Sequence, residues 1–486
     1  MRTENKCNRD DKYIGLSELM YLCFFGIMFF AKGIGLYDGQ LIYKLILLAA
    51  FGCLGVKMLV TKHSYLEWAV ILGLLGFSAM ICLQSGEKGI FICTAMVVAM
   101  KDVSVDRVFK SGLVLWCISA GGCFLYSLLR MDSVRMEVQH KLGQTFVPRY
   151  FMGFPHPNVL HISYFVLVVL LLYAWKEDYN WKQLFWLMLG NVFIFIYSFS
   201  ITGFAVVTFL LVIALYIKVK KIGNFDYALV KAVFPLCLLI SVALPVIAEG
   251  KVLQLADKVF NHRIGYSKHF LQWDMITWIG NPLAEITDNI LAIDNSFVFA
   301  LIIYGALIFL GLVLAYFSLI KSYAYEKKNM ELAIIISYFV AGITEPLLFN
   351  TSFKNLTFVF LGAFLFEKMK KYSTKEVALI KDKNIELEVK NQYRQILSVR
   401  LKRIRQCIQQ KYVYISIVAS VIISGVYAVS RAVPQRIFER KEEEMESLIF
   451  FERIRSGATM FLVVYTVLLF VLCFNNYRKN QKQKVG

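Results

Sequence analysis

Residues 201–217 read ITGFAVVTFLLVIALYI, an apolar run that is followed at once by the basic residues Lys218, Lys220 and Lys221. A run of this kind predicts a helix that crosses the hydrocarbon core of a bilayer, which takes about 20 residues. The whole chain has this character, because 58% of its 486 residues are hydrophobic and only 18% are charged. Its mean hydropathy is +0.59. Since soluble domains carry about 25% charged residues, the sequence predicts an all-α, polytopic transmembrane helical bundle.

Fourteen such runs can be counted along the chain. They are 14–31, 40–60, 65–84, 89–100, 109–129, 159–175, 183–199, 201–217, 228–248, 296–320, 330–346, 355–366, 412–432 and 458–475. We expect them to form a twelve-span membrane core at 1–366 and a C-terminal two-span hairpin at 412–486, joined by a cytoplasmic segment at 367–411.

The basic residues orient these spans. The chain has 53 Lys and Arg against 34 Asp and Glu, a net charge of +19, and cytoplasmic loops of membrane proteins collect positive charge. With both termini in the cytoplasm, the short, strongly basic connections all fall on the inner side. The excess charge is therefore assigned to membrane topology, and no nucleic-acid partner is expected. The N-terminal tail precedes an uncleaved first span, since no cleavage site follows it.

Polar chemistry gathers in the outer connections, two of which are long, at 130–158 and 249–295. A third outer segment, 433–457, is rich in charged residues. The first long loop ends in Gly153-Phe154-Pro155-His156-Pro157-Asn158, where the next span begins. Its prolines fix the backbone on both sides of His156, which is expected in a stiff turn, and Asn158 is placed to cap the following helix. The basic residues before this turn are Arg130, Arg135, Lys141 and Arg149.

The second long loop contains Asn261-His262-Arg263-Ile264 and ends in Asp294-Asn295-Ser296. Arg263 can bind a phosphate through two parallel hydrogen bonds, which Lys cannot do. The Asp294-Asn295-Ser296 motif is equally typical of a helix cap and of a polar binding group. Glu345 stands at the outer edge of a span, where a carboxylate needs water or a cation. A zinc site on His262 and His269 would lack further ligands, so no metal or other cofactor is expected.

In their order and spacing these motifs resemble the Wzy-type polymerases of bacterial O-antigen and capsule polysaccharides, which are related to the O-antigen ligases. The resemblance covers roughly residues 140–355. It is carried by Gly153 to Asn158, Ser200-Ile201-Thr202-Gly203, Asn261 to Ile264, Asp294 to Ser296, and Glu345 with Asn350. The family pattern has Arg at the position of Ile201. Either that Arg is not essential, or another basic residue supplies its charge.

The resemblance implies a GT-C-like fold and metal-independent glycosyl transfer on the outer face of the bacterial plasma membrane. Donor and acceptor would be glycans linked to undecaprenyl diphosphate, held in membrane lipid, with chain-length regulator and flippase proteins as potential partners. Arg149 and Arg263 would stabilise the leaving diphosphate, and alanine at either position is expected to abolish polymer without lowering the amount of protein in the membrane. His156 or His262 would act as the base. The candidate substrate-binding residues are Arg130, Arg135, Asn158, Asp294, Asn295 and Glu345.

Several alternatives stay open at this point. A lipid-linked oligosaccharide flippase would also suit fourteen spans, but the chain has no internal repeat and few charges at mid-membrane. An O-antigen ligase would differ mainly in its acceptor. The segment 372–411 predicts a basic amphipathic helix that lies on the anionic inner leaflet or mediates self-association. The C-terminal two-span hairpin either anchors the chain or contacts a partner protein.

Overall fold

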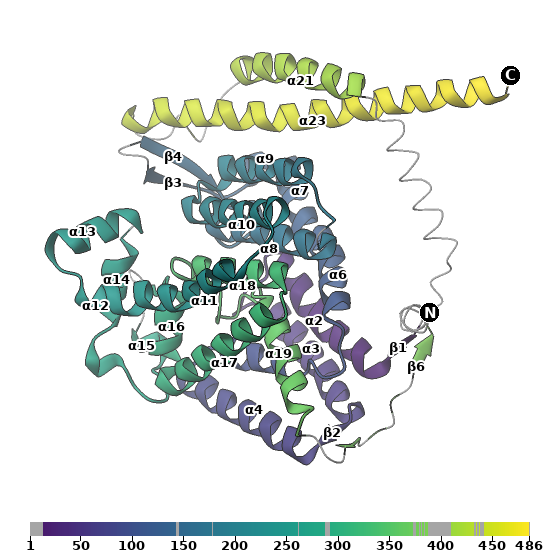
Figure 1. The fold of residues 1–486 in the computed structure, drawn as a ribbon. Coiled ribbons are helices and arrows are strands. Elements are labelled where there is room, and N and C mark those ends of the chain that lie inside the picture. Colours follow the sequence, from purple (N-terminus) through teal and green to yellow (C-terminus); the bar gives the residue numbers. More distant parts are fainter. Residues whose placement is uncertain are drawn as a thin grey trace.

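The computed structural model describes residues 13–485, apart from 142–144, 177, 261, 287–291, 373–375, 379, 381, 383, 387–409, 432–433, 435–436 and 438–441. Within these residues the chain is mainly helical (Figure 1). Ten helices are long and apolar enough to cross a membrane, so the protein is a multi-pass membrane protein. They are α2 (Leu16–Gly33), α3 (Leu41–Val60), α4 (Tyr65–Ser85), α6 to α7 (Val105–Leu129), α8 (Pro157–Trp175), α10 (Ile201–Val219), α11 to α12 (Asn224–Ile247), α17 (Gly305–Tyr325), α21 (Gln410–Ser430) and α23 (Glu442–Val485).

The other four predicted spans also fall on helices, namely α5 (Gly89–Val98), α9 (Trp181–Ser198), α18 (Asn329–Gly342) and α19 (Thr357–Met369). None of the four is among the ten long apolar helices. Helices α5, α18 and α19 have only 10, 14 and 13 residues, so that they extend about 15–21 Å at 1.5 Å per residue. The existence of the helices is confirmed, whereas the number of membrane crossings stays a prediction.

The predicted span 296–320 is wrong in one respect, because the helix breaks. Helix α16 (Ser296–Ile303) ends at Tyr304, and α17 starts afresh at Gly305, whose φ is +86°. The preceding loop fills this break. The side-chain amide of Asn281 donates to the Ile302 carbonyl at 2.8 Å, and the Ala306 amide donates to the Thr277 carbonyl at 2.9 Å. Loop atoms thus satisfy backbone groups that the interrupted helix leaves unpaired.

Gly305 gives a direct test of this break. A Cβ at this position would lie 2.3 Å from the Gly280 nitrogen and 2.6 Å from the Trp278 carbonyl oxygen, and the positive φ disfavours any side chain. Gly305→Ala is therefore expected to lower the free energy of unfolding by about 1–3 kcal/mol, measured as a lower thermal midpoint in detergent. Gly311→Ala is the control, because a Cβ there meets nothing within 4 Å. Equal midpoints for the two variants would contradict the described junction.

Connections gather at two ends of the bundle. Strands β3 (Met136–Lys141) and β4 (Thr145–Tyr150) form an antiparallel hairpin, and we call this end the β3–β4 end. Connections predicted to lie on the outer side contact one another there: the Lys88 ammonium binds the Asp38 carboxylate at 2.7 Å, and the Thr351 amide donates to Glu87 at 3.1 Å. The arrangement agrees with the predicted alternation, while the assignment of this end to the cell exterior stays a prediction.

The opposite end carries two small sheets. Strand β1 (Tyr13–Gly15) pairs with β6 (Asn384–Glu386), and β2 (His63–Ser64) pairs with β5 (Glu376–Val377). The predicted amphipathic helix at 372–411 is therefore wrong where β5 and β6 run, since an extended segment crosses between the ends of several helices. The Lys101 ammonium, for example, binds Glu376 at 2.9 Å. The rest of that prediction falls at 387–409, outside the described residues.

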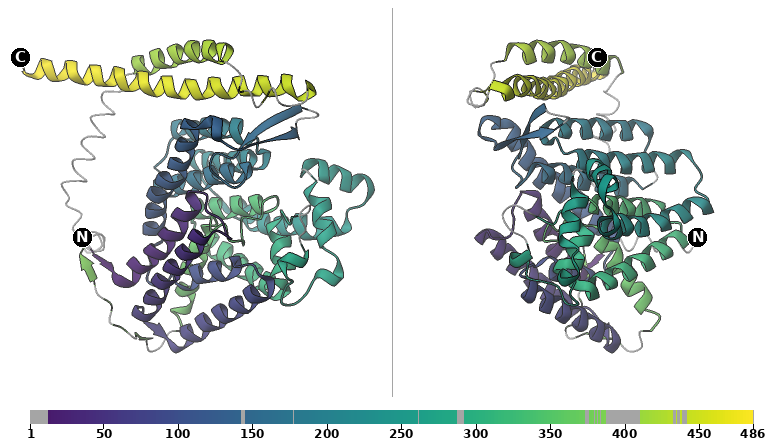
Figure 2. Two further views of the ribbon diagram at one scale, coloured as in Figure 1. Left: turned by 180° about the vertical axis from the view of Figure 1, so that it is seen from behind. Right: turned by 90° about the vertical axis from the view of Figure 1, so that its left-hand side faces the viewer.

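Helices α21 and α23 pack against each other along one side of the bundle (Figures 1 and 2). Helix α23 has 44 residues and begins at Glu442. The predicted outer segment 433–457 is thus helical from Glu442 onward, and the predicted span 458–475 is only the middle of one longer helix. Helix α23 packs on β4, so this charged segment contacts the core.

The remaining elements of the described chain are short. The connection at 249–295 folds into α13 (Gly250–Val259), α14 (Arg263–Phe270), the 3₁₀ turn η4 (Trp273–Met275) and α15 (Leu283–Ile286). The segment before β3 holds η2 (Met131–Ser133), and the π-helical turns η1 (Cys117–Gly121) and η3 (Leu239–Ala243) lie within the α6–α7 and α11–α12 spans. The buried core runs through α8, α16, α18 and α19, which lie among the other helices and are apolar over most of their surface.

Candidate functional site

The β3–β4 hairpin holds Arg149 in a closed set of acceptors. Arg149 lies directly opposite Glu137 in the register, and Gln139, two residues further along β3, shares that face. The guanidinium Nη1 donates to Glu137 at 2.7 Å and to Gln139 at 2.8 Å, and Nε donates to the Ser198 carbonyl at 2.8 Å. Only 2% of Arg149 is exposed. Burial lowers the pKa of this guanidinium, and Glu137 opposes that shift.

The turn Gly153 to Asn158 is built differently from the prediction. His156, not Asn158, caps α8: its Nδ1 accepts a hydrogen bond from the Asn158 backbone amide at 3.1 Å, with Pro157 at the first helical position. The prediction that Asn158 caps the helix is therefore wrong. Its side chain instead accepts a hydrogen bond from Arg149 Nη2 and donates one to Glu345 at 3.0 Å. The side chain is available for this because His156 already satisfies the helix end.

Arg263 reaches the same place from α14. Its Nη2 lies 3.6 Å from a Glu345 oxygen and 3.6 Å from an Asp294 oxygen. Asn158 and Glu345 thus bridge the two arginines that the sequence placed in separate loops. Together these five residues, Arg149, Asn158, Arg263, Asp294 and Glu345, form what we call the arginine cluster.

The two arginines of the cluster differ in how they are held. All three nitrogens of Arg149 donate to acceptors at short range. Arg263 is also buried, but its carboxylate contacts of 3.6 Å are longer than the roughly 2.8 Å of a charge-assisted hydrogen bond. Its Nη1 is buried and has no hydrogen-bond partner among the described residues. Since a buried unpaired donor costs about 1–3 kcal/mol, Arg263 is the member of the cluster that would gain most from an added acceptor.

Charge points to the same residue. Three carboxyl groups, those of Glu137, Asp294 and Glu345, face two guanidinium groups, so an anion would bind more readily if one carboxyl group moved away. The Asp294 side chain is 41% exposed, and it can turn toward solvent at low cost. Desolvation raises the pKa of the Asp294 carboxyl, and Arg263 only partly offsets this. Asp294 is therefore the carboxylate that can move away most easily. Its movement would break the ion pair with Arg263.

Other predicted site residues lie beside the cluster. Asn295 caps α16, since its side-chain oxygen accepts from the amides of Phe297 and Val298 at 2.9 and 3.2 Å. The Ser296 hydroxyl donates to the Glu345 carbonyl at 2.6 Å. The Asp294-Asn295-Ser296 motif thus acts as a helix cap and as a tether that places Glu345 near Arg263.

The two remaining predicted arginines are exposed on the surface. The Arg130 guanidinium lies over the Tyr126 ring at 5.2 Å, and that of Arg135 lies over the Phe151 ring at 4.5 Å. The structure does not place either of them in the arginine cluster. Phe151 in turn contacts the His156 ring, with centroids 6.1 Å apart. The Phe151 ring therefore lies between Arg135 and the capping residue His156.

The two predicted histidines have different surroundings. The Nε2 atom of His156 lies 3.8 Å from Glu137, which borders the cluster. Because Nδ1 accepts a hydrogen bond from a backbone amide, a neutral His156 carries its proton on Nε2. Nδ1 has to release this hydrogen bond before it can take up a proton. His262 is exposed and directly precedes Arg263, in the left-handed region with φ of 65°. The preceding Asn261 lies outside the described residues.

The motif Ser200-Ile201-Thr202-Gly203 has a structural role. The Ser200 hydroxyl accepts from the Gly203 amide at 3.2 Å and caps α10. A Cβ on Gly203 would lie 2.6 Å from the His161 side chain, so α8 and α10 pack closely here. Ile201 is half exposed. Close to this turn, the Arg149 guanidinium donates a hydrogen bond to the Ser198 carbonyl at 2.8 Å.

Several contributing residues were missed by sequence reasoning. Glu137 and Gln139 alternate with Met136 and Val138 with the period of a strand, a short signal that was present in residues 136–139. His161 gave no such signal. Its ring nitrogens lie 2.9 Å from the Ser198 hydroxyl and 2.8 Å from the Asn191 amide oxygen, and only the packing of α8 against α9 brings these groups together.

Comparisons with protein-family models, curated proteins and solved structures find no match for this chain.

Proposed function

We propose that this chain polymerises oligosaccharide repeat units linked to undecaprenyl diphosphate, by metal-independent glycosyl transfer at the outer face of a bacterial plasma membrane. The observation that supports this most is the arginine cluster: Arg149 and Arg263 come from the two longest predicted outer loops, and they flank one Asn158–Glu345 bridge. Two guanidinium groups at the end of a membrane bundle suit a lipid-carried diphosphate, whose tail has to stay in the bilayer.

The reaction follows from these groups. An acceptor sugar hydroxyl attacks the anomeric carbon of the donor, and the bond from that carbon to the diphosphate oxygen breaks. Negative charge grows on the leaving diphosphate, which a fixed cation stabilises more in the transition state than in the ground state. In our proposal the buried Nη1 of Arg263 donates a hydrogen bond to an oxygen of the leaving diphosphate, and Arg149 keeps Asn158 and Glu345 in place. Asp294 turns toward solvent as the anion enters.

The proton of the acceptor hydroxyl needs a base. The two predicted candidates are His156 and His262, and the geometry favours His262, because its imidazole is exposed beside Arg263 whereas His156 uses Nδ1 to cap α8. The proposal therefore assigns the base to His262 and assigns to His156 the placement of Asn158. His262→Ala should then slow polymerisation more than His156→Asn, since Asn can also cap a helix.

A reconstituted assay tests the proposal. Purified protein in vesicles is given synthetic lipid-linked repeats, and the products are separated by size. A polymerase produces a ladder of lipid-linked chains, whereas a ligase transfers a glycan once to a different acceptor, and a flippase only moves the repeats across the bilayer. Because Arg263→Ala should remove the ladder in the same vesicles, it serves as the control for contaminating activity. Transbilayer movement without any ladder would contradict the proposal and favour the flippase.

A further inference from the structure

The C-terminal helix α23 meets the core through a buried ion pair. Glu452 and Arg455 are 3% and 2% exposed. Arg455 Nε donates to Glu452 at 2.8 Å, and Arg455 Nη2 donates to the other carboxylate oxygen, so the ion pair is bidentate. The Tyr150 hydroxyl donates to the same carboxylate at 2.5 Å. Tyr150 is the last residue of β4 and directly follows Arg149, so α23 is bonded to the strand that carries the cluster.

A second tyrosine completes this contact from α9. The Arg455 guanidinium lies 5.0 Å from the Tyr150 ring centroid and 5.8 Å from that of Tyr197. The Tyr197 hydroxyl is hydrogen-bonded to Thr459 of α23. Tyr197 directly precedes Ser198, whose carbonyl accepts a hydrogen bond from Arg149. Of the two residues that α23 holds, Tyr150 is therefore the chain neighbour of Arg149, and Tyr197 is the chain neighbour of an acceptor that binds Arg149.

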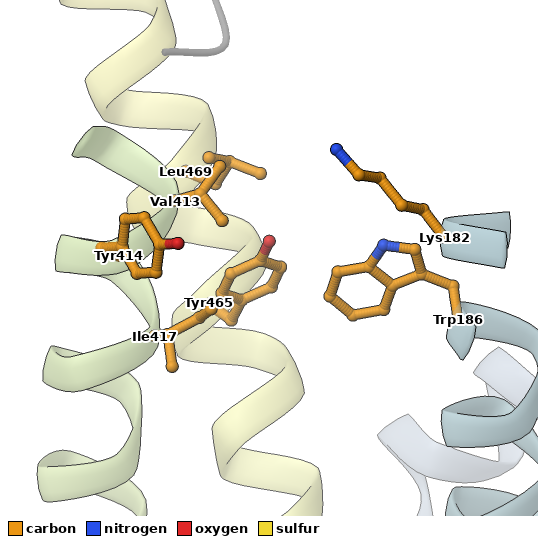
Figure 3. A pocket seen from close by; sticks show the side chains of 7 residues that line it. All are labelled: Lys182, Trp186, Val413, Tyr414, Ile417, Tyr465 and Leu469. Carbon is orange, nitrogen blue, oxygen red and sulfur yellow. The ribbon is translucent and has the colours of Figure 1, made fainter. Parts of the chain in front are cut away.

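Away from this contact, a groove of about 600 Å³ lies between helix α9 and the hairpin of α21 and α23. Across the groove, the ring centroids of Trp186 and Tyr465 lie 6.3 Å apart. Figure 3 shows Lys182 and Trp186 of α9 on one side of the groove, and Tyr414 of α21 and Tyr465 of α23 on the other. The polar attachment of the hairpin to α9 and β4 is thus concentrated beside Arg149.

We infer that Glu452 and Arg455 are positioning residues, through which the C-terminal hairpin holds β4 and Arg149 in place. Taking an ion pair out of water is costly unless all of its groups are satisfied, and such a pair specifies one geometry rather than adding stability. Here the Glu452 carboxylate accepts a hydrogen bond from the Tyr150 hydroxyl. The Arg455 guanidinium lies over the rings of Tyr150 and Tyr197, which attract a cation. The region lies outside the part of the chain that resembles the polymerases, so the family pattern does not account for it. The catalytic consequence rests on the proposed function, whereas the docking does not.

The first experiment measures docking without any activity. A protease site is inserted at 395–405 in the full chain, the purified protein is cut in detergent, and the fraction of the C-terminal fragment that stays on the core is quantified. We expect the fragment to stay in the wild type, and Arg455→Met or Glu452→Ala to reduce retention at least fivefold. Glu446→Ala is the matched control, because Glu446 is an exposed carboxylate on the same helix. Unchanged retention in both test variants would overturn the docking.

The second experiment measures positioning. Tyr150→Phe removes only the hydroxyl that binds Glu452, and it should lower kcat for polymer formation about tenfold with KM changed less than twofold. Tyr325→Phe, at an exposed tyrosine, is the control. Because Arg149 does not contact Glu452, non-additive shifts of the thermal midpoint for Arg149→Lys and Glu452→Gln would show coupling through β4.

The outcomes separate the two ideas. Additive midpoint shifts together with an unchanged kcat would overturn the positioning role even if the fragment docks. A wild-type protein that makes no ladder would overturn the proposed function, while retention and the midpoint cycle would still decide whether α23 holds β4.

Discussion

Arg263→Ala is expected to abolish polymer formation, with a loss of at least 10²–10³-fold in kcat, the range seen when one preorganised donor to a developing anion is removed. The fold should persist. Asp294 is partly exposed and can be solvated, and Glu345 keeps the hydrogen bond from Asn158. The measurement is the ladder assay at equal amounts of protein, with single lipid-linked repeats accumulating in its place.

Two further variants sharpen this result. Arg263→Lys keeps the charge but loses the forked geometry, so its activity should fall between those of the wild type and Arg263→Ala. Lys258→Ala removes one positive charge from an exposed position in the same connection and should leave the ladder unchanged. A normal ladder from Arg263→Ala would remove the diphosphate role from this residue.

Arg149→Ala is expected to fail in a different way, because it should lose both activity and stability. The substitution leaves Glu137 without its cation and removes the donors to Gln139, Asn158 and Ser198. Removing one partner of a buried ion pair costs about 3–5 kcal/mol. Because Glu137 is partly exposed, we expect Arg149→Ala to lower the free energy of unfolding by about 3 kcal/mol. Thermal unfolding in detergent and the amount of protein in the membrane measure this loss. The sequence alone had suggested that this variant would keep its membrane level.

The controls for Arg149 lie on the same hairpin. His140→Ala changes an exposed residue of β3 and should alter neither the thermal midpoint nor the ladder. Arg149→Lys should recover part of the stability, since it retains one charged donor to Glu137, but it cannot reach four acceptors at once. If Arg149→Ala unfolds at the wild-type temperature, the hairpin does not depend on this network, and the division of roles between the two arginines is wrong.

The elements that could be predicted share one physical property. A helix in a bilayer satisfies its backbone hydrogen bonds internally and needs only an apolar run of sufficient length, which can be read locally. Every predicted run therefore coincides with a helix. The break at Gly305 was missed because it depends on carbonyl and amide groups of residues 277–281, which are distant in the chain. Strands β5 and β6 were missed because each consists of two or three residues whose partners lie far away in the chain.

For the candidate site, the sequence indicated several of the residues but not the contacts between them. Residue type, position in the outer connections and the resemblance to the polymerases together placed Arg149, Asn158, Arg263, Asp294 and Glu345 among the site candidates. Sequence could not assign those partners: it gave Asn158 a capping role that His156 performs, and it did not connect Arg149 with Glu137 or Ser198. Hydrogen bonds and ion pairs act over about 3–4 Å, so they depend on which segments meet.

The apolar periodicity and the placement of charge by themselves determined that this protein is a helical bundle in a membrane, with its polar residues concentrated in particular connections. Burial of an apolar face is non-directional, and it can be recognised one segment at a time. The tertiary structure alone decided that Arg149 is fully bonded, that Arg263 keeps a buried donor without a partner among the described residues, and that α23 reaches back to β4. These features depend on directional contacts between residues that are far apart in the chain, and folding is what brings such residues together.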